Sequence, residues 1–192
     1  MVKIGFIVEG ESEEILLKSD YFRNYLRSKN INFVDVVANV KGGGNLLPHR
    51  LPEYTSFLKG EGATHFIILT DLERGPAIQD VKSRISAPDS HYVVISVKAL
   101  EAWYLADSTL LTSLFKKKYT YEFPERTEGM PINTLGAEFV AHTGRGCGNS
   151  KPRLALKMLN GGFSIENAAS HPNCDSAKYF LEKLKMVASL PV

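Results

Sequence analysis

The first 14 residues place a predicted strand directly before a predicted helix, with acidic residues at the junction. Residues 4–8 form an apolar run rich in β-branched and aromatic side chains, which is typical of a buried strand. The run ends at Glu9 and Gly10, and apolar residues then recur at helical spacing from Ile15 to Leu26. In open α/β sheets, ligands bind at the carboxyl ends of the strands. Glu9 is therefore predicted to lie at that edge, with more acids in the first helical turn.

Strand and helix patterns alternate over the first half of the sequence and give way to helical patterns afterwards. This alternation predicts a mostly parallel four-stranded sheet with helices on both faces. We expect an α/β core over residues 1–107 and a helical C-terminal extension, packed on that core, over residues 108–192. The predicted strands are 4–8, 32–40, 65–70 and 92–97; the predicted helices are 11–29, 46–58, 77–85, 99–115, 134–142, 151–159 and 175–187, with a short turn over 164–169. Within 46–58, Pro48 and Pro52 should confine the regular helix to the later residues.

Composition places the chain among ordinary globular proteins. The 192 residues are 44% hydrophobic and 23% charged, and a formal charge of +2 neither requires nor excludes a nucleic-acid partner. The two cysteines, Cys147 and Cys174, predict no disulfide framework and fit a reducing compartment. The N-terminal residues do not read as a signal peptide, and no segment is apolar enough to span a bilayer. We expect a cytoplasmic protein without a membrane partner.

Acidic residues follow two of the predicted strands. Glu9 follows the first strand and Asp71 the third, and Glu13 and Glu73 lie close to them in the sequence. Carboxylates gathered at one sheet edge repel each other unless a hard cation such as Mg²⁺ neutralises them. Two such ions would polarise a phosphodiester and generate a hydroxide nucleophile. The alternative for Glu13 and its neighbour Glu14 is that they simply complement the helix dipole.

Glu101 is a further candidate because it lies in an apolar stretch just after the fourth predicted strand. A carboxylate in such surroundings is costly unless it is paired or bound to a metal. An ion pair with a neighbouring lysine, such as Lys98, explains it equally well.

Two glycine-rich segments could approach a phosphate. Residues 144–153 expose backbone N–H groups just before a predicted helix, and residues 41–45 follow the second strand. Neither segment has the spacing of a P-loop, and ordinary turn chemistry accounts for glycines in both places. Lys151 is a candidate for stabilising charge on a phosphate. The predicted substrate contacts in these segments are Lys41, Gly43, Asn45, Ser150 and Arg153.

The acidic motifs resemble those of the Toprim domain, which topoisomerases, bacterial primases, recombination mediators and overcoming-lysogenization-defect (OLD) nucleases share. The resemblance rests on Val8-Glu9-Gly10 with Glu13 after strand one, and on Asp71-x-Glu73 after strand three. Over nearly its full length the chain is similar to a family of uncharacterised Toprim-like bacterial proteins. The segments that carry this broader likeness are 41–45, 70–72, 101–103 and 151–184.

The resemblance implies a four-stranded parallel sheet and Mg²⁺- or Mn²⁺-dependent phosphodiester chemistry. Glu9 matches the strand-one acid, with Glu13 as its partner in the nuclease branch, and Asp71 matches the first acid of an Asp-x-Asp motif. Glu73 stands where the motif has its second aspartate, so the number of metal ions is open. Glu101 is a looser match to a later Ser-x-Glu motif because Ser96 does not keep the spacing. Lys151 corresponds to the lysine of the nuclease branch.

Two functions are consistent with these residues. The first is a nuclease acting on DNA or RNA, with Glu9, Asp71 and Glu73 as metal ligands and Glu13 and Glu101 as ligand or base. The second is a non-catalytic module that binds nucleic acid or a partner protein; transfer chemistry on a nucleotide-like small molecule is a third, less favoured reading. The resemblance leaves open a partner such as an ATPase, a homodimer, and a setting in genome defence.

Overall fold

Four parallel strands run through the centre of the protein in the order β2-β1-β3-β4. The structure is a computed structural model and describes residues 2–73, 77–148 and 150–190. The expected four-stranded parallel sheet, flanked by helices and followed by a helical C-terminal half, is confirmed. The strands are β1 (Ile4–Val8), β2 (Phe33–Asn39), β3 (His65–Asp71) and β4 (His91–Ser96).

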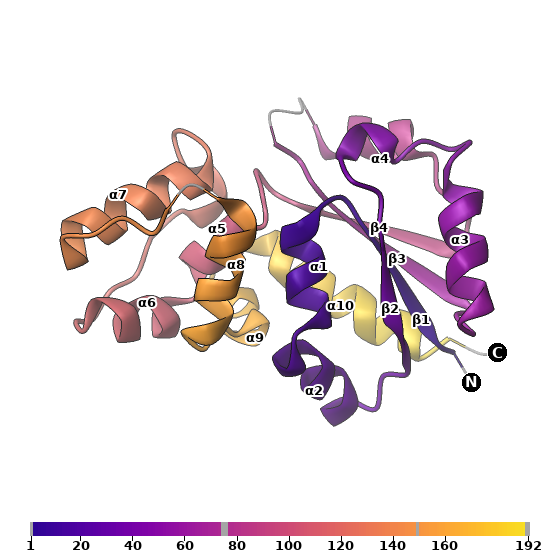
Figure 1. Cartoon of the computed structure of the whole chain (residues 1–192), viewed down its shortest axis with the longest axis horizontal. Helices are drawn as coiled ribbons and strands as arrows, with labels where there is room; N and C mark the ends of the chain where they lie inside the picture. Colours follow the sequence, from indigo (N-terminus) through magenta and orange to yellow (C-terminus); the bar gives the residue numbers. More distant parts are fainter. Residues whose placement is uncertain (1, 74–76, 149, 191–192) are drawn as a thin grey trace.

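Helices cover both faces of the sheet because the strand side chains alternate between two apolar layers. Ile7, Phe66 and Ile68 pack with α3 (Leu51–Gly60) and α4 (Ile78–Ile85). The opposite side chains pack with α1 (Glu11–Lys18), α2 (Asp20–Ser28) and α10 (Asp175–Ala188). Figure 1 shows α3 and α4 on one side of the strands and α1 and α10 on the other.

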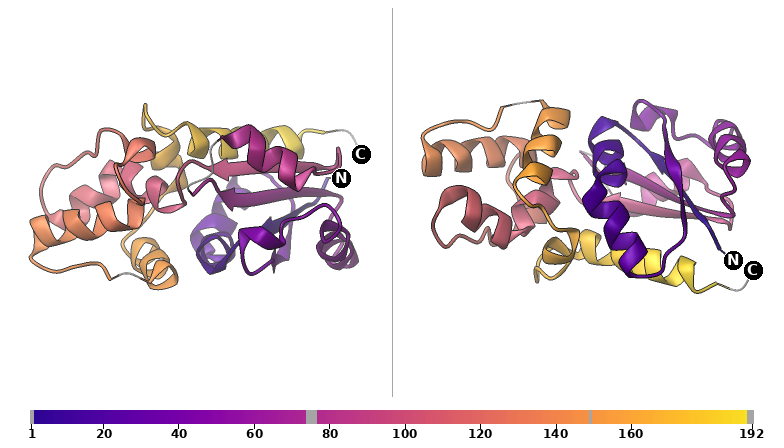
Figure 2. Two further views of the ribbon diagram at one scale, coloured as in Figure 1. Left: turned by 90° about the horizontal axis from the view of Figure 1, so that it is seen from above. Right: turned by 60° about the horizontal axis from the view of Figure 1, so that its bottom comes forward.

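The remaining helices form a separate group beside the sheet, and α10 returns from it along the sheet (Figures 1 and 2). One apolar cluster runs from the sheet into this group, and Trp103 joins the two by stacking on Phe180 and donating to the hydroxyl of Ser176 at 2.7 Å. The division of the chain at residue 107 stays a prediction. The elements of the group are α5 (Glu101–Ala106), α6 (Ser108–Phe115), η2 (Pro124–Arg126), α7 (Pro131–Thr143), α8 (Lys151–Asn160) and α9 (Ile165–Ala169).

Two helices predicted as continuous are each broken by a capping residue. The pattern over 11–29 divides at Ser19, whose hydroxyl accepts from the N–H of Phe22 and begins α2. The pattern over 99–115 divides at Asp107, whose carboxylate accepts from the N–H of Leu110 and begins α6. The side chains of serine and aspartate accept hydrogen bonds from backbone N–H groups and so mark the start of a new helix. The spacing of apolar residues does not reveal such capping.

Prolines stand at the starts of two other helices. α3 begins at Leu51 with Pro52 at its N-terminal end, in the later part of 46–58 as expected, after the short turn η1 (Gly43–Asn45). α7 begins at Pro131, since proline is compatible with the first helical position. Within the described residues, no helix has the length and apolar character needed to cross a membrane.

Asp107 offers a test of how the helical group is held together. It is fully buried, and its carboxylate accepts from the N–H of Leu110 (2.9 Å), the N–H of Ser164 (2.8 Å) and the amide of Asn167 (3.1 Å). Asp107→Ala should lower the free energy of unfolding by about 3 kcal/mol, because one buried and two half-buried donors lose their buried acceptor. Urea denaturation measures this. Thr109→Ala, at an exposed position of α6, is the control, and equal losses in the two variants would contradict the assignment.

Candidate functional site

The carboxyl ends of β1 and β3 bring Glu9 and Asp71 together. Val8 pairs in register with Leu69, so the residues that follow lie side by side at the edge of the sheet. The Glu9 carboxylate accepts from the backbone N–H of Asp71 at 3.2 Å and from the hydroxyl of Thr70. Two residues sixty-two positions apart therefore share one edge of the sheet, as the alternating pattern predicted.

Asp71 is the most heavily bonded acid at this edge. Its side chain is buried, and Oδ1 accepts from the Ser96 hydroxyl at 2.6 Å and from the N–H of Leu100 at 2.9 Å. Its Oδ2 accepts from the ammonium of Lys151 at 3.0 Å. One carboxylate thus joins β3 to the end of β4, to the start of α5 and to the first residue of α8.

Glu101 lies against the same lysine. It is 1% exposed, the Lys151 ammonium lies 3.8 Å from its Oε2, and neither carboxylate oxygen has a hydrogen-bond partner in the described part of the chain. The alternative that Glu101 pairs with Lys98 is wrong, because the Lys98 ammonium donates instead to the carbonyls of Thr127 and Gly129. A buried carboxylate without hydrogen bonds is costly and points to a group that is still to bind there.

Burial and mutual repulsion shift the acids toward their neutral forms. Burial, with the charges of Asp71 and Glu9, raises the pKa of Glu13 to about 8. Burial, with the charge of Asp71 and against that of Lys151, raises the pKa of Glu101 to about 7. Burial also raises the pKa of Asp71, although Lys151 and Ser96 oppose the shift. Burial lowers the pKa of Lys151, but its carboxylate partners outweigh that effect and the net shift is upward.

A cleft of about 680 Å³ opens over these acids. Five of the predicted site residues line it: Glu9, Glu13, Asp71, Lys41 and Lys151. The other residues of its wall are Gly10, Glu11, Ser12, Glu14, Asn39, Gly42 and Pro152.

The glycine-rich segment after β2 packs directly on Glu9. A Cβ at Gly43 would lie 2.9 Å from the carboxylate of Glu9, so only glycine permits this approach without movement of the acid. Arg84 of α4 donates to the Gly43 carbonyl at 2.7 Å and holds the segment in place. The amide of Asn45 donates to the carbonyls of Val40 and Lys41, so this predicted contact residue shapes the loop from within.

Six predicted residues are not among those that line the cleft: Glu101, Gly43 and Asn45, described above, and Glu73, Ser150 and Arg153. Glu73 is exposed, in a left-handed conformation (φ 49°), and its charge acts on Glu101. Ser150 precedes α8 as its N-cap residue without a capping hydrogen bond from its side chain, and Arg153 is exposed on the same helix. Their roles as metal ligand or phosphate contacts stay predictions.

Tyr104 is a further candidate site residue, which the sequence did not indicate. It is fully buried, and its hydroxyl has no hydrogen-bond partner among the described residues. Burial and the charges of Glu101, Glu13 and Asp71 raise its pKa, so its hydroxyl lies within the electrostatic influence of the acids. The available signal was its position three residues after Glu101, which places both side chains on one side of α5.

The donor set fits a hard divalent cation. Glu9, Glu13, Asp71 and Glu101 offer only carboxylate oxygens, which Mg²⁺ and Mn²⁺ prefer, and both oxygens of Glu101 lack a hydrogen bond from any described residue. Across residues 2–73, 77–148 and 150–190, however, no three histidine, cysteine, aspartate or glutamate side chains are already arranged to hold a metal ion. In this structure the ammonium of Lys151 supplies the positive charge among the acids.

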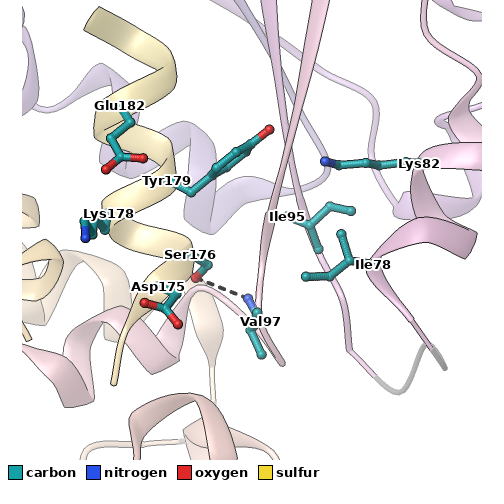
Figure 3. A pocket seen from close by; sticks show the side chains of 9 residues that line it. All are labelled: Ile78, Lys82, Ile95, Val97, Asp175, Ser176, Lys178, Tyr179 and Glu182. Atoms are coloured by element: carbon teal, nitrogen blue, oxygen red, sulfur yellow. Dashed lines mark hydrogen bonds between the residues drawn. The ribbon is translucent and has the colours of Figure 1, made fainter. Parts of the chain in front are cut away.

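A second hollow, of about 370 Å³, lies between α4, β4 and α10 and shares no residue with the cleft. Figure 3 shows Ile78 and Ile95 on one side of it and Tyr179 on the other, with the Ser176 hydroxyl accepting from the N–H of Val97. Its walls carry none of the buried acids, so the candidate site is the cleft.

No family model and no curated protein matches the sequence. Among solved structures, the chain is similar to the C-terminal region of the Burkholderia pseudomallei OLD protein. The identity is 15%, the TM-score is 0.46, and the alignment covers 95% of this chain and 98% of that chain. A likeness at this level assigns no function, so the candidate site stands on its own geometry.

The raised pKa of Glu13 gives a pH-dependent prediction. Folding raises this pKa from 4.5 to about 8, so the folded state binds the proton more tightly and the stability contributed by Glu13 falls as pH rises between these values. Glu13→Gln should therefore stabilise the protein by about 2 kcal/mol or more at pH 8 and by almost nothing at pH 5. Thermal or urea unfolding at both pH values measures the difference. Equal stabilisation by Glu13→Gln at pH 5 and pH 8 would show that folding does not raise the pKa of Glu13.

Proposed function

We propose that the protein cleaves phosphodiester bonds in DNA or RNA with the help of Mg²⁺ or Mn²⁺. The observation that carries this proposal is the convergence of four carboxylates with Lys151 at the carboxyl edge of a parallel sheet, where Glu9, Glu13 and Asp71 line a cleft with the lysine. Buried acids that repel each other lower stability, and such sites are kept where they bind cations or transfer protons.

The residues divide by their positions. Glu9 and Asp71 lie at the strand ends as metal ligands, with Glu73 as a third ligand by resemblance to the Toprim motif. Glu13 and Glu101 assist as ligand or base, and pKa values of about 8 and 7 suit proton transfer near neutral pH. A bound divalent ion would polarise the phosphodiester and lower the pKa of a bound water.

Basic and glycine residues around the cleft would position the nucleic-acid backbone. Lys151 lies among the acids as a contact for phosphate charge, and Lys41 lines the same cleft. Gly43, Ser150 and Arg153 are proposed contacts further along the backbone. Asn45 would act by shaping the loop. A setting in genome defence, an ATPase partner and a homodimer follow only from the resemblance.

A second function, a module that binds nucleic acid or protein without cleavage, is favoured by one observation. Asp71 is already paired with Lys151, and the part of the chain that the structure describes holds no preformed metal group. Such a module would bind little Mn²⁺ and cleave nothing.

A cleavage assay decides between the two functions. Supercoiled and linear DNA and a structured RNA are incubated with the protein in Mg²⁺ and in Mn²⁺. Asp71→Asn should reduce turnover at least 100-fold with an unchanged circular-dichroism spectrum, because the central ligand loses its charge. Asp89→Asn, on the exposed surface, is the control. Unchanged turnover in Asp71→Asn would remove Asp71 from the site, and no cleavage by the unaltered protein would favour the binding module.

The approach of Gly43 to Glu9 gives a second test. Gly43→Ala should leave the free energy of unfolding within about 1 kcal/mol, since the atoms displaced are the end of a flexible side chain. It should weaken Mn²⁺ binding at least 10-fold in calorimetry, because Glu9 must leave its place beside Asp71. Gly44→Ala is the matched control, since its Cβ would contact nothing within 4 Å. Equal affinities in both variants would exclude Glu9 as a ligand.

A further inference from the structure

Two groups of carboxylates lie near Asp71. Glu9 and Glu13 line the same cleft as Asp71. Glu101 is not among the residues that line this cleft, and it contacts the same ammonium as Asp71, that of Lys151. Two positions for a cation therefore flank Asp71, and one of them already contains a positive charge.

The number of lone-pair directions on the Asp71 carboxylate limits how many further cations it can bind. An ionised carboxylate has about four lone-pair directions. The Ser96 hydroxyl and the N–H of Leu100 use both directions of Oδ1, and Lys151 uses one of Oδ2. One direction remains, enough for a single divalent ion.

From these contacts we infer that the ammonium of Lys151 permanently fills one of the two cation positions, so that the site takes one divalent ion and not two. This inference rests on the proposed function and specifies its metal stoichiometry. The ion enters on the side of Glu9 and Glu13, and Lys151 remains the fixed cation between Asp71 and Glu101.

Glu101 shows why the lysine stays. Neither of its oxygens has a hydrogen bond among the described residues, and Lys151 is the cation beside it. Moving Lys151 away would leave a buried carboxylate without compensation, which is strongly unfavourable. Lys151 is also fixed by its backbone, since it begins α8, which packs on α1. If its charge is removed by mutation, a second divalent ion should take its place.

Calorimetric titration with Mn²⁺ alone tests this stoichiometry in the full chain. The unaltered protein should bind one ion, and Lys151→Met should bind two. Lys157→Met is the matched control on the same helix, because the Lys157 ammonium lies 4.2 Å from the ring centre of Phe139; it should bind one ion. Electron paramagnetic resonance of the Mn²⁺-saturated proteins should show isolated ions in the unaltered protein and a spin-coupled pair in Lys151→Met.

Each outcome has a defined meaning. Two ions in the unaltered protein would overturn the inference and leave the proposed function standing. One ion in a folded Lys151→Met would also overturn it, because the lysine then fills no cation position. If Lys151→Met does not fold, the resonance spectrum of the unaltered protein decides: isolated ions support the inference and a coupled pair overturns it. No binding by the unaltered protein would overturn the inference and the proposed function together.

Discussion

The buried carboxylate of Asp71 is the interaction on which the rest of the structure depends. It ends the central strand β3 and is bonded by Ser96, Leu100 and Lys151. A carboxylate removed from water must be compensated in this way, or it becomes protonated or destabilises the fold. The same three bonds fix β4, the start of α5 and the start of α8. The helical C-terminal half is therefore tied to the sheet at the point where the candidate chemistry lies.

Burial and mutual repulsion of the carboxylates make the acid cluster unfavourable for the stability of the fold. The pKa values of Glu13 and Glu101, raised to about 8 and 7, mean that these groups retain protons that water would remove. Natural proteins keep such strain mainly at functional sites. The oxygens of Glu101 and the hydroxyl of Tyr104 are buried and have no hydrogen-bond partner among the described residues, so the polar contacts of this region are incomplete there.

The backbone around Glu9 fixes the position of its carboxylate. Gly43 lets a loop approach the Glu9 carboxylate to a distance that a Cβ would prevent, and Arg84 of α4 donates a hydrogen bond to the carbonyl of Gly43 in that loop. Glu9 is in turn aligned by the hydroxyl of Thr70 and the N–H of Asp71. Its carboxylate is enclosed between β3 and the loop, and the cleft lies over it.

The sequence by itself determined the sheet and its acidic edge. Strand and helix patterns that alternate along the sequence predict a parallel sheet, and the carboxyl ends of parallel strands meet at one edge. Glu9 and Asp71 could therefore be placed side by side without coordinates. Helix breaks at Ser19 and Asp107 were not predicted, because side-chain capping is a local competition that periodicity does not show. Tertiary structure alone decided that Lys151, and not the nearby Lys98, compensates Asp71 and Glu101. That choice depends on where α8 packs, eighty residues further along the chain, and long-range packing leaves no spacing signal in the sequence.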